Sequence, residues 1–304
     1  MATAPSSVLR ALDLTVRRRV QGLLAGDHAS ALLGVGTELA QVRPYQPGDD
    51  VRRIDWNVTA RTQEPHVRVH VAERALTTWL VLDGSPSMAF GTADRTKADL
   101  AEGVALTVGH LACRGANRLG VIGFGGRAPL SLPPTQGRAG LLGLLAALDD
   151  RRPQLDADGS GDSAESLGEA LLRTGRLAPQ RGLVVVVADF RGREGVESWR
   201  GPLLRLCARH DVLAVEVRDQ REQELPNMGE LWLVDPETGR HLRVDTRRRA
   251  LRERFAAAAS ADRSEVAAAL AACGADHVVL TTSGDWLRPL ATFLLRREHR
   301  GRRR

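Results

Sequence analysis

The chain has 304 residues, of which 43% are hydrophobic and 26% are charged, and these values are typical of a globular protein. The length allows two domains, or one large α/β domain with an appendage. The net charge is +6 and the pI is about 10.3, but Lys97 is the only lysine and arginines occur along the whole chain. This arginine bias is a property of the composition, so we expect no nucleic-acid binding.

Cysteine usage and hydropathy indicate a reducing compartment. Cys113, Cys207 and Cys273 are odd in number and lie in apolar helical contexts, which is typical of free buried thiols. A zinc site built from His110, Cys113, Cys207 and His210 is an alternative, although nothing in the sequence brings the two pairs together. No apolar stretch reaches the ~18 residues needed to span a bilayer, and the first residues lack the form of a signal peptide. We therefore expect a cytoplasmic protein.

Residues 1–74 are expected to form an N-terminal appendage, with a helix at residues 8–24 and a β-hairpin. Residues 67–71 alternate apolar and polar side chains, as in a half-buried strand. Pro47 and Gly48 favour a type II turn. Acids and arginines follow this turn closely. The simplest interpretation is that Asp49, Asp50 and Asp55 pair with arginines, namely Arg52, Arg53 and Arg61, and fasten the segment to the main body.

From residue 75 to residue 304, short apolar runs alternate with amphipathic segments and form the expected main domain. The apolar runs predict strands at residues 79–82, 118–125, 183–188, 212–217 and 278–280. The amphipathic segments predict helices at about 95–113, 140–148, 167–177, 199–210, 248–273 (in two parts) and 286–295. Two hairpins are predicted, one joining residues 118–125 to 128–132 and one joining residues 231–234 to 241–244. This alternation predicts an α/β fold with a doubly wound, mostly parallel sheet.

Two of the predicted strands end on a carboxylate. Asp83 follows the run 79–82, and Ser85 and Ser87 stand at alternate positions on the loop behind it, whereas Asp189 follows the run 183–188. The carboxyl ends of parallel strands meet at one edge of the sheet, where open α/β sheets bind ligands. A carboxylate and two hydroxyls on one tight loop suit a hard cation such as Mg²⁺. The alternative is that these side chains only cap the next helix.

These motifs together resemble a known bacterial family. Asp83-x-Ser85-x-Ser87, followed by Asp189 after a later strand, resembles the metal-ion-dependent adhesion site (MIDAS) of von Willebrand factor A-type domains. Residues 45–56, which read YQPGDDVRRIDW, together with residues 60–61, are similar to the domain of unknown function 58 family. Members of this family are often encoded beside MoxR-type AAA+ ATPases. The resemblance covers the chain from about residue 14 to the final helix.

The resemblance implies a metal site and a mode of binding. It implies that Ser85 and Ser87 bind Mg²⁺ (or Mn²⁺) directly, and that Asp83 and Asp189 bind it directly or through water. Neutral hydroxyl ligands leave a divalent ion short of negative charge, so a carboxylate from a protein partner completes the coordination. We therefore expect a non-enzymatic, metal-dependent protein-interaction module that works with a MoxR-type AAA+ ATPase in chaperone-like assembly.

One position departs from the pattern of adhesion sites. Those sites carry a threonine shortly before the helix that corresponds to residues 167–177, whereas this chain has Glu165 there, with Ser163 and Ser166 beside it. If Glu165 binds the metal, the site is more fully neutralised and attracts an acidic partner less. If none of the three side chains reaches the metal, binding is weak or lost.

Two other functions compete with this hypothesis. A phosphatase-like hydrolase could use Asp83 as its nucleophile, but such enzymes usually need a second carboxylate two positions on, where Ser85 stands. Nucleic acid could bind the arginine-rich residues 296–304, although such a tail is more often a solvated terminus. The chain carries no G-x-x-x-x-G-K-[ST] motif, so ATPase activity would have to come from another chain.

Overall fold

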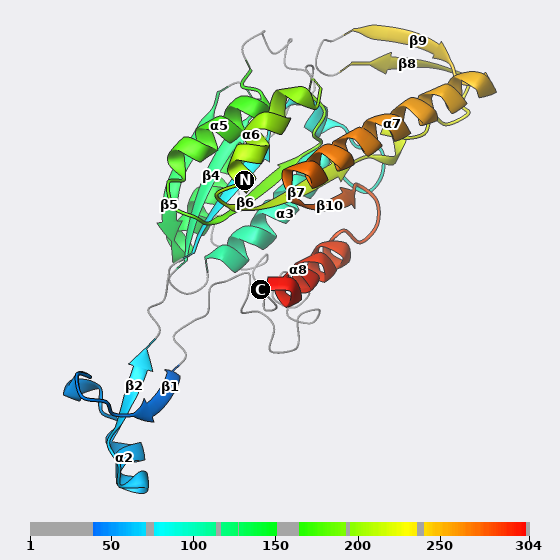
Figure 1. Cartoon of the computed structure of the whole chain (residues 1–304). Helices are drawn as coiled ribbons and strands as arrows, with labels where there is room; N and C mark the ends of the chain where they lie inside the picture. Colours follow the sequence, from blue (N-terminus) through cyan, green and yellow to red (C-terminus); the bar gives the residue numbers. More distant parts are fainter. Residues whose placement is uncertain are drawn as a thin grey trace, which may run out of the picture.

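The computed structural model describes residues 39–70, 76–113, 117–126, 128–150, 164–192, 195–235 and 240–301 (Figure 1). The helix predicted over residues 8–24 and the last three arginines lie outside these ranges, as does the predicted domain boundary at residue 74. In the described ranges, every helix is too short or too polar to cross a bilayer.

The central sheet of the described chain has six strands in the order β10-β7-β6-β3-β4-β5. Their bounds are β3 (Thr77–Asp83), β4 (Arg118–Phe124), β5 (Leu130–Gln136), β6 (Leu183–Ala188), β7 (Asp211–Arg218) and β10 (Asp276–Thr281). All pairs are parallel except β4 with β5, which is antiparallel. This arrangement confirms the predicted mostly parallel sheet and the predicted hairpin beside residues 118–125.

Helices cover both faces of this sheet (Figure 1). One face packs against α3 (Lys97–Ala112), α4 (Gly137–Asp150) and α8 (Leu287–Gly301), and the other against α5 (Leu167–Leu177), α6 (Glu197–Cys207) and α7 (Arg249–Cys273). Successive strand residues point to opposite faces. In β6, for example, Val185 belongs to the first core, between the sheet and the helices α3, α4 and α8. Val186 belongs to the second core, between the sheet and the helices α5, α6 and α7. The unbroken apolar runs in the sequence therefore reflect burial on both sides, as predicted.

The predicted two-part helix over residues 248–273 is wrong. α7 is one continuous helix of 25 residues. Its sequence is rich in alanine and contains no glycine or proline that would interrupt the backbone hydrogen bonds. The helix ends where Gly274 takes a left-handed conformation with φ 78°.

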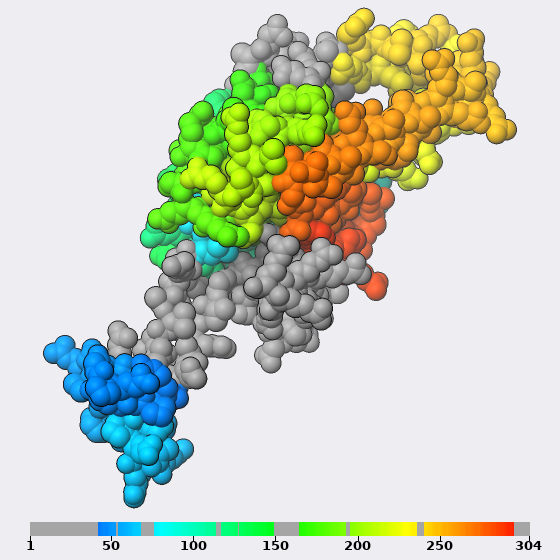
Figure 2. All heavy atoms as spheres, in the orientation of Figure 1, coloured from blue at the N-terminus to red at the C-terminus, as the bar shows by residue number. Residues whose placement is uncertain are grey.

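A second hairpin, β8 (Glu230–Val234) with β9 (His241–Asp245), forms a separate antiparallel sheet, as predicted. Figure 2 shows that this hairpin and the first turns of α7 extend beyond the compact body that contains the central sheet. Trp232 on β8 is 67% exposed. The hairpin therefore presents a large apolar side chain to solvent.

The edge strand β5 is irregular. Its register with β4 shifts between Leu119 and Val121, which marks a β-bulge. Pro133 and Pro134 lie in this stretch of the strand. Because proline has no backbone N–H, β5 is suited to an edge and not to the middle of a sheet.

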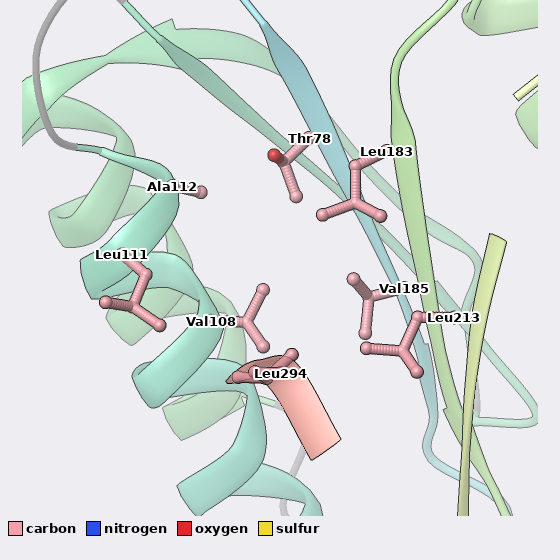
Figure 3. A pocket seen from close by; sticks show the side chains of 8 residues that line it. All are labelled: Thr78, Val108, Leu111, Ala112, Leu183, Val185, Leu213 and Leu294. Atoms are coloured by element: carbon pink, nitrogen blue, oxygen red, sulfur yellow. The ribbon is translucent and has the colours of Figure 1, made fainter. Parts of the chain in front are cut away.

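A small gap in the first core lies between α3, the sheet and the end of α8 (Figure 3). Its lining is apolar apart from the hydroxyl of Thr78, and its members are Thr78, Val108, Leu111, Ala112, Leu183, Val185, Leu213 and Leu294. A gap with so few polar groups is a packing feature of the core and does not suit a polar ligand.

The described N-terminal residues form a small unit around β1 (Leu39–Pro44) and β2 (His66–His70), which pair antiparallel. Between them lie η1 (Val51–Arg53) and α2 (Trp56–Thr62). Gly48 has φ 110°, and the amide of Asp49 donates to the carbonyl of Gln46 at 3.0 Å, which confirms the predicted type II turn.

The predicted partner of Asp49 is wrong, and the acids of this unit also bind its backbone. Asp49 forms a bidentate ion pair with Arg43, with both N–O distances at 2.7 Å. Asp50 accepts from the amide of Arg52, and Asp55 caps α2 by accepting from the amide of Asn57. The carboxylates therefore organise the turn and the short helices locally.

Candidate functional site

The site begins at the C-terminal end of β3. Asp83 is the last residue of this strand and pairs with Phe124 of β4. Its Oδ1 atom accepts a hydrogen bond from the amide of Ser85 at 2.8 Å. A short helix, η2 (Pro86–Ala89), follows, and Met88 anchors it in the core with no exposed surface. The loop is thus fixed at both ends.

The structure joins this loop to the end of β6, the strand beside β3. The hydroxyl oxygens of Ser85 and Ser87 lie 3.0 Å apart, and Ser87 donates to Oδ2 of Asp189 at 2.8 Å. The amide of Arg191 donates to the other oxygen of Asp189 at 3.0 Å. Asp83, Ser85, Ser87 and Asp189 therefore occupy one edge of the sheet, as expected from the parallel pairing of β3 with β6.

The backbone after Asp189 is strained. Phe190 has φ 56°, which is an outlier for a bulky side chain. Its ring is 2% exposed and packs edge-to-face on Trp199 at a centroid distance of 5.6 Å. This packing holds the backbone in an unfavourable conformation, and strain of this kind is commonly concentrated at functional loops.

Gly125, after β4, closes the other side of the site. Its φ is 70°, and a Cβ atom there would lie 2.9 Å from the amide nitrogen of Ser85 and 3.0 Å from Oδ1 of Asp83. Only glycine fits such a close approach to the loop. The amide of Gly125 also donates to the carbonyl of Glu165 at 3.1 Å. The loop before α5 that carries Glu165, here called the middle loop, therefore reaches the site through its backbone.

The side chains of this middle loop are engaged elsewhere. The carboxylate of Glu165 binds Arg173 of α5 at 2.8 and 2.6 Å. The same arginine donates to the carbonyls of Gly123 and Leu130, so it ties α5 to β4 and β5. Ser166 caps α5 in a reciprocal arrangement with Glu169.

Neither Glu165 nor Ser166 therefore joins the four side chains at the sheet edge in this structure, and Ser163 lies outside the described residues.

Lys97 is a member of the site that sequence reasoning missed. It is the first residue of α3, its side chain has no exposed surface, and it is the only lysine of the chain. Its Nζ atom lies 2.8 Å from Oδ2 of Asp189 and 2.7 Å from Oε1 of Glu222. The sequence offered one signal for this role, because the only lysine of the chain lies near the start of a predicted helix that follows the Asp83 loop.

Asp219 is a second missed residue, and it ties together the loops around the site. It follows β7 and has no exposed surface. Its carboxylate accepts from the amide and hydroxyl of Thr92 at 2.8 and 2.6 Å and from the hydroxyl of Thr282 at 2.6 Å. It also accepts from the amide of Arg221 at 2.8 Å and donates its own amide to Glu222 at 3.1 Å.

Charge at the site is unevenly compensated. Burial, and then the negative charge of Asp189, raise the pKa of Asp83 to about 7. Burial also acts to raise the pKa of Asp189, but the charge and hydrogen bond of Lys97 outweigh it and lower that pKa. In the same way, Asp189 and Glu222 outweigh the burial of Lys97 and raise its pKa. Asp83 is therefore the carboxyl group of the site whose charged form is less well compensated than that of Asp189.

The donors suit a hard cation. Carboxylate and hydroxyl oxygens are what Mg²⁺ prefers, and a cation near Asp83 would favour its ionised form. The ammonium of Lys97 already neutralises Asp189. The types of the four side chains thus fit Mg²⁺, although one of them, Asp189, also binds the ammonium of Lys97.

The zinc alternative is wrong. Cys113 follows α3 and Cys207 ends α6, and these helices pack on opposite faces of the sheet. Within the ranges that the structure describes, no group of three His, Cys, Asp or Glu side chains could hold a metal ion.

The chain has an α/β fold with a mostly parallel central sheet, as the sequence predicted. Solved structures similar to it include conserved hypothetical protein BatB from Bacteroides thetaiotaomicron, at 17% identity and TM-score 0.45, covering 74% of this chain and 100% of that one. The SpRpn10 VWA domain is similar at 14% identity and TM-score 0.39, covering 71% of this chain and 93% of that one.

The chain belongs to the family described as "Protein of unknown function DUF58", whose model matches residues 41–265. Its relatives include uncharacterized protein Rv1480 from Mycobacterium tuberculosis, 43% identical over 294 residues, which are 96% of this chain and 89% of that protein. Uncharacterized protein MAV169 from Mycobacterium avium is 40% identical over 136 residues, which are 44% of this chain and 75% of that protein. The predicted family is confirmed.

Proposed function

We propose that this protein is a protein-interaction module and that its interaction site is the edge formed by the loops after β3 and β6. We further propose that Asp83, Ser85 and Ser87, with Asp189 directly or through water, hold Mg²⁺ (or Mn²⁺) there. When bound, the ion would supply a positive charge that accepts a carboxylate from a protein partner. The observation that supports this proposal is the hydrogen-bonded chain from Ser85 through Ser87 to Asp189, with the carboxyl group of Asp83 bound to the amide of Ser85.

This chain's own residues prepare the site. The amide of Ser85 orients Asp83, and the amide of Arg191 orients Asp189. Gly125 has no Cβ atom, so its backbone can lie close to the loop. We favour binding over hydrolysis because Ser85 stands where a phosphoaspartate enzyme would need its second carboxylate.

The direct test is calorimetric titration of Mg²⁺ and Mn²⁺ into the wild type and Asp83→Ala. Asp262→Ala is the matched control, because Asp262 is an exposed carboxylate on α7. We expect binding in the wild type and in the control, and none in Asp83→Ala. Equal affinity in Asp83→Ala would refute the assignment of the site.

The resemblance to proteins encoded beside MoxR-type ATPases suggests the partner, and we propose that such an AAA+ ATPase is bound. The test is co-purification with the MoxR-type ATPase of the same genome, in Mg²⁺ and in EDTA. Capture that needs Mg²⁺ and is lost in Asp83→Ala supports the proposal. Equal capture in EDTA would contradict the role of the metal.

A further inference from the structure

The site contains a cation of its own. Lys97 brings an ammonium group into the protein interior, with no exposed surface, next to a candidate metal ligand. Buried lysines are rare, and they are found where carboxylates compensate their charge. Since the chain uses arginine at every other basic position except histidines, the single lysine indicates that a compact ammonium is needed here.

The ammonium uses lone pairs that a metal would also need. Oδ2 of Asp189 accepts from both Nζ of Lys97 and the hydroxyl of Ser87, each at 2.8 Å. A divalent cation that drew on Asp189, directly or through water, would have to share this oxygen with a positive charge. Two cations in one low-dielectric site repel each other strongly.

We propose that Lys97 is a built-in counter-cation that competes with divalent metal for Asp189 and so sets the metal affinity of the site. The inference rests on the proposed metal site and concerns how that site is regulated. When Lys97 binds Asp189, the negative charge of the site is partly neutralised without metal. A metal then binds tightly only when a further negative charge, such as a partner's carboxylate, is added.

The surroundings of Lys97 allow it to release Asp189. Its second partner, Glu222, lies at 2.7 Å on the other side. Glu222 is itself held by the amide of Asp219 and by Arg191, whose guanidinium lies 3.8 Å away. The ammonium therefore stays paired when a metal takes over Asp189, and no buried charge is left alone. An arginine could not replace it easily, because its planar fork is larger and has fixed donor directions.

The test compares Lys97→Met with the wild type and with Arg181→Met. Methionine keeps an unbranched apolar stem and removes the ammonium, whereas Arg181→Met removes a positive charge from an arginine that is 77% exposed and pairs with Asp211 outside the site. We expect Lys97→Met to bind Mg²⁺ at least ~10-fold more tightly than the wild type in calorimetry. Arg181→Met should stay within about threefold of the wild type.

Thermal unfolding gives a second readout that does not need a fully folded variant. Loss of the ammonium leaves Asp189 and Glu222 uncompensated, so Lys97→Met should unfold at lower temperature without metal. Saturating Mg²⁺ should raise its Tm more than it raises that of the wild type, because the ion replaces the missing charge. A variant that is unfolded without metal should fold when Mg²⁺ is added.

The outcomes separate this inference from the proposed function. Equal Mg²⁺ affinity in Lys97→Met and the wild type overturns the inference and leaves the metal site standing. Binding only in Lys97→Met supports the inference and shows that the free wild-type protein is not a Mg²⁺ site. If neither protein binds Mg²⁺ and Mg²⁺ does not stabilise Lys97→Met, both proposals fail.

Discussion

The buried carboxylate of Asp219 should be a principal source of stability around the site. We expect Asp219→Ala to lower the free energy of unfolding by about 3 kcal/mol. Thr92 and Arg221 lie at exposed positions, so water replaces the carboxylate as their partner. The hydroxyl of Thr282 has no exposed surface and would be left unsatisfied, which alone costs about 1–3 kcal/mol. The lost charge-assisted bonds supply the remainder.

The assay is urea unfolding followed by circular dichroism, with Asp211→Ala as the control. Asp211 is 53% exposed and pairs with the exposed Arg181, so the change in the free energy of unfolding in Asp211→Ala should be within experimental error. A loss below about 1 kcal/mol in Asp219→Ala, with an unchanged m-value, would refute the reasoning.

The pH dependence gives an independent check on Asp219. Burial acts against its charged form, but hydrogen bonds from Thr282 and Thr92 outweigh it and lower the pKa of Asp219. A carboxylate whose pKa is lower in the folded state contributes stability above its unfolded pKa of about 3.9. That contribution is lost as the pH falls through the folded pKa, and Asp219→Ala should lose less stability than the wild type over this range.

Three further predictions concern the neighbouring elements. Phe190→Ala should unfold more easily than Phe190→Gly by about 1 kcal/mol, because only glycine adopts φ 56° without strain; the opposite order in urea unfolding would show that the strain is absent. Burial lowers the pKa of His210, so the unfolded state takes up a proton first and stability should fall as the pH drops below roughly 6.5. His210→Gln should make that fall shallower, and identical slopes would contradict the prediction. Glu165→Ala should leave Mg²⁺ affinity unchanged in calorimetry, because its carboxylate is bound by Arg173; lost affinity would make Glu165 a metal ligand after all.

The sequence was sufficient to predict the sheet and two of its strand ends. The runs that became β3 and β6 are apolar at every position because both faces of the sheet are covered, and a polar residue there marks the end of the strand. Parallel neighbours bring such ends together, so Asp83 and Asp189 could be placed at one edge from the pattern alone.

The missed members of the site depend on contacts between distant parts of the chain. Lys97 meets Glu222 across 125 residues, and Asp219 meets Thr92 across 127 residues. No periodicity encodes which strand end faces the start of α3. The predicted ligand Glu165 was misplaced for a more local reason, because Arg173 of α5, eight residues on, binds its carboxylate. Local sequence patterns therefore identify polar side chains at strand ends, but the side chains that each one contacts depend on the tertiary structure.

The two prolines of β5 have a consequence for how this protein meets other chains. An edge strand with free N–H and C=O groups invites an additional strand from a second molecule, which is one route to peptide recognition and also to aggregation. Pro133 and Pro134 remove two successive donors, and the bulge beside them breaks the spacing of those that are left. We therefore expect a partner strand to pair poorly with this stretch of β5, which favours recognition on that side of the molecule by side chains and loops.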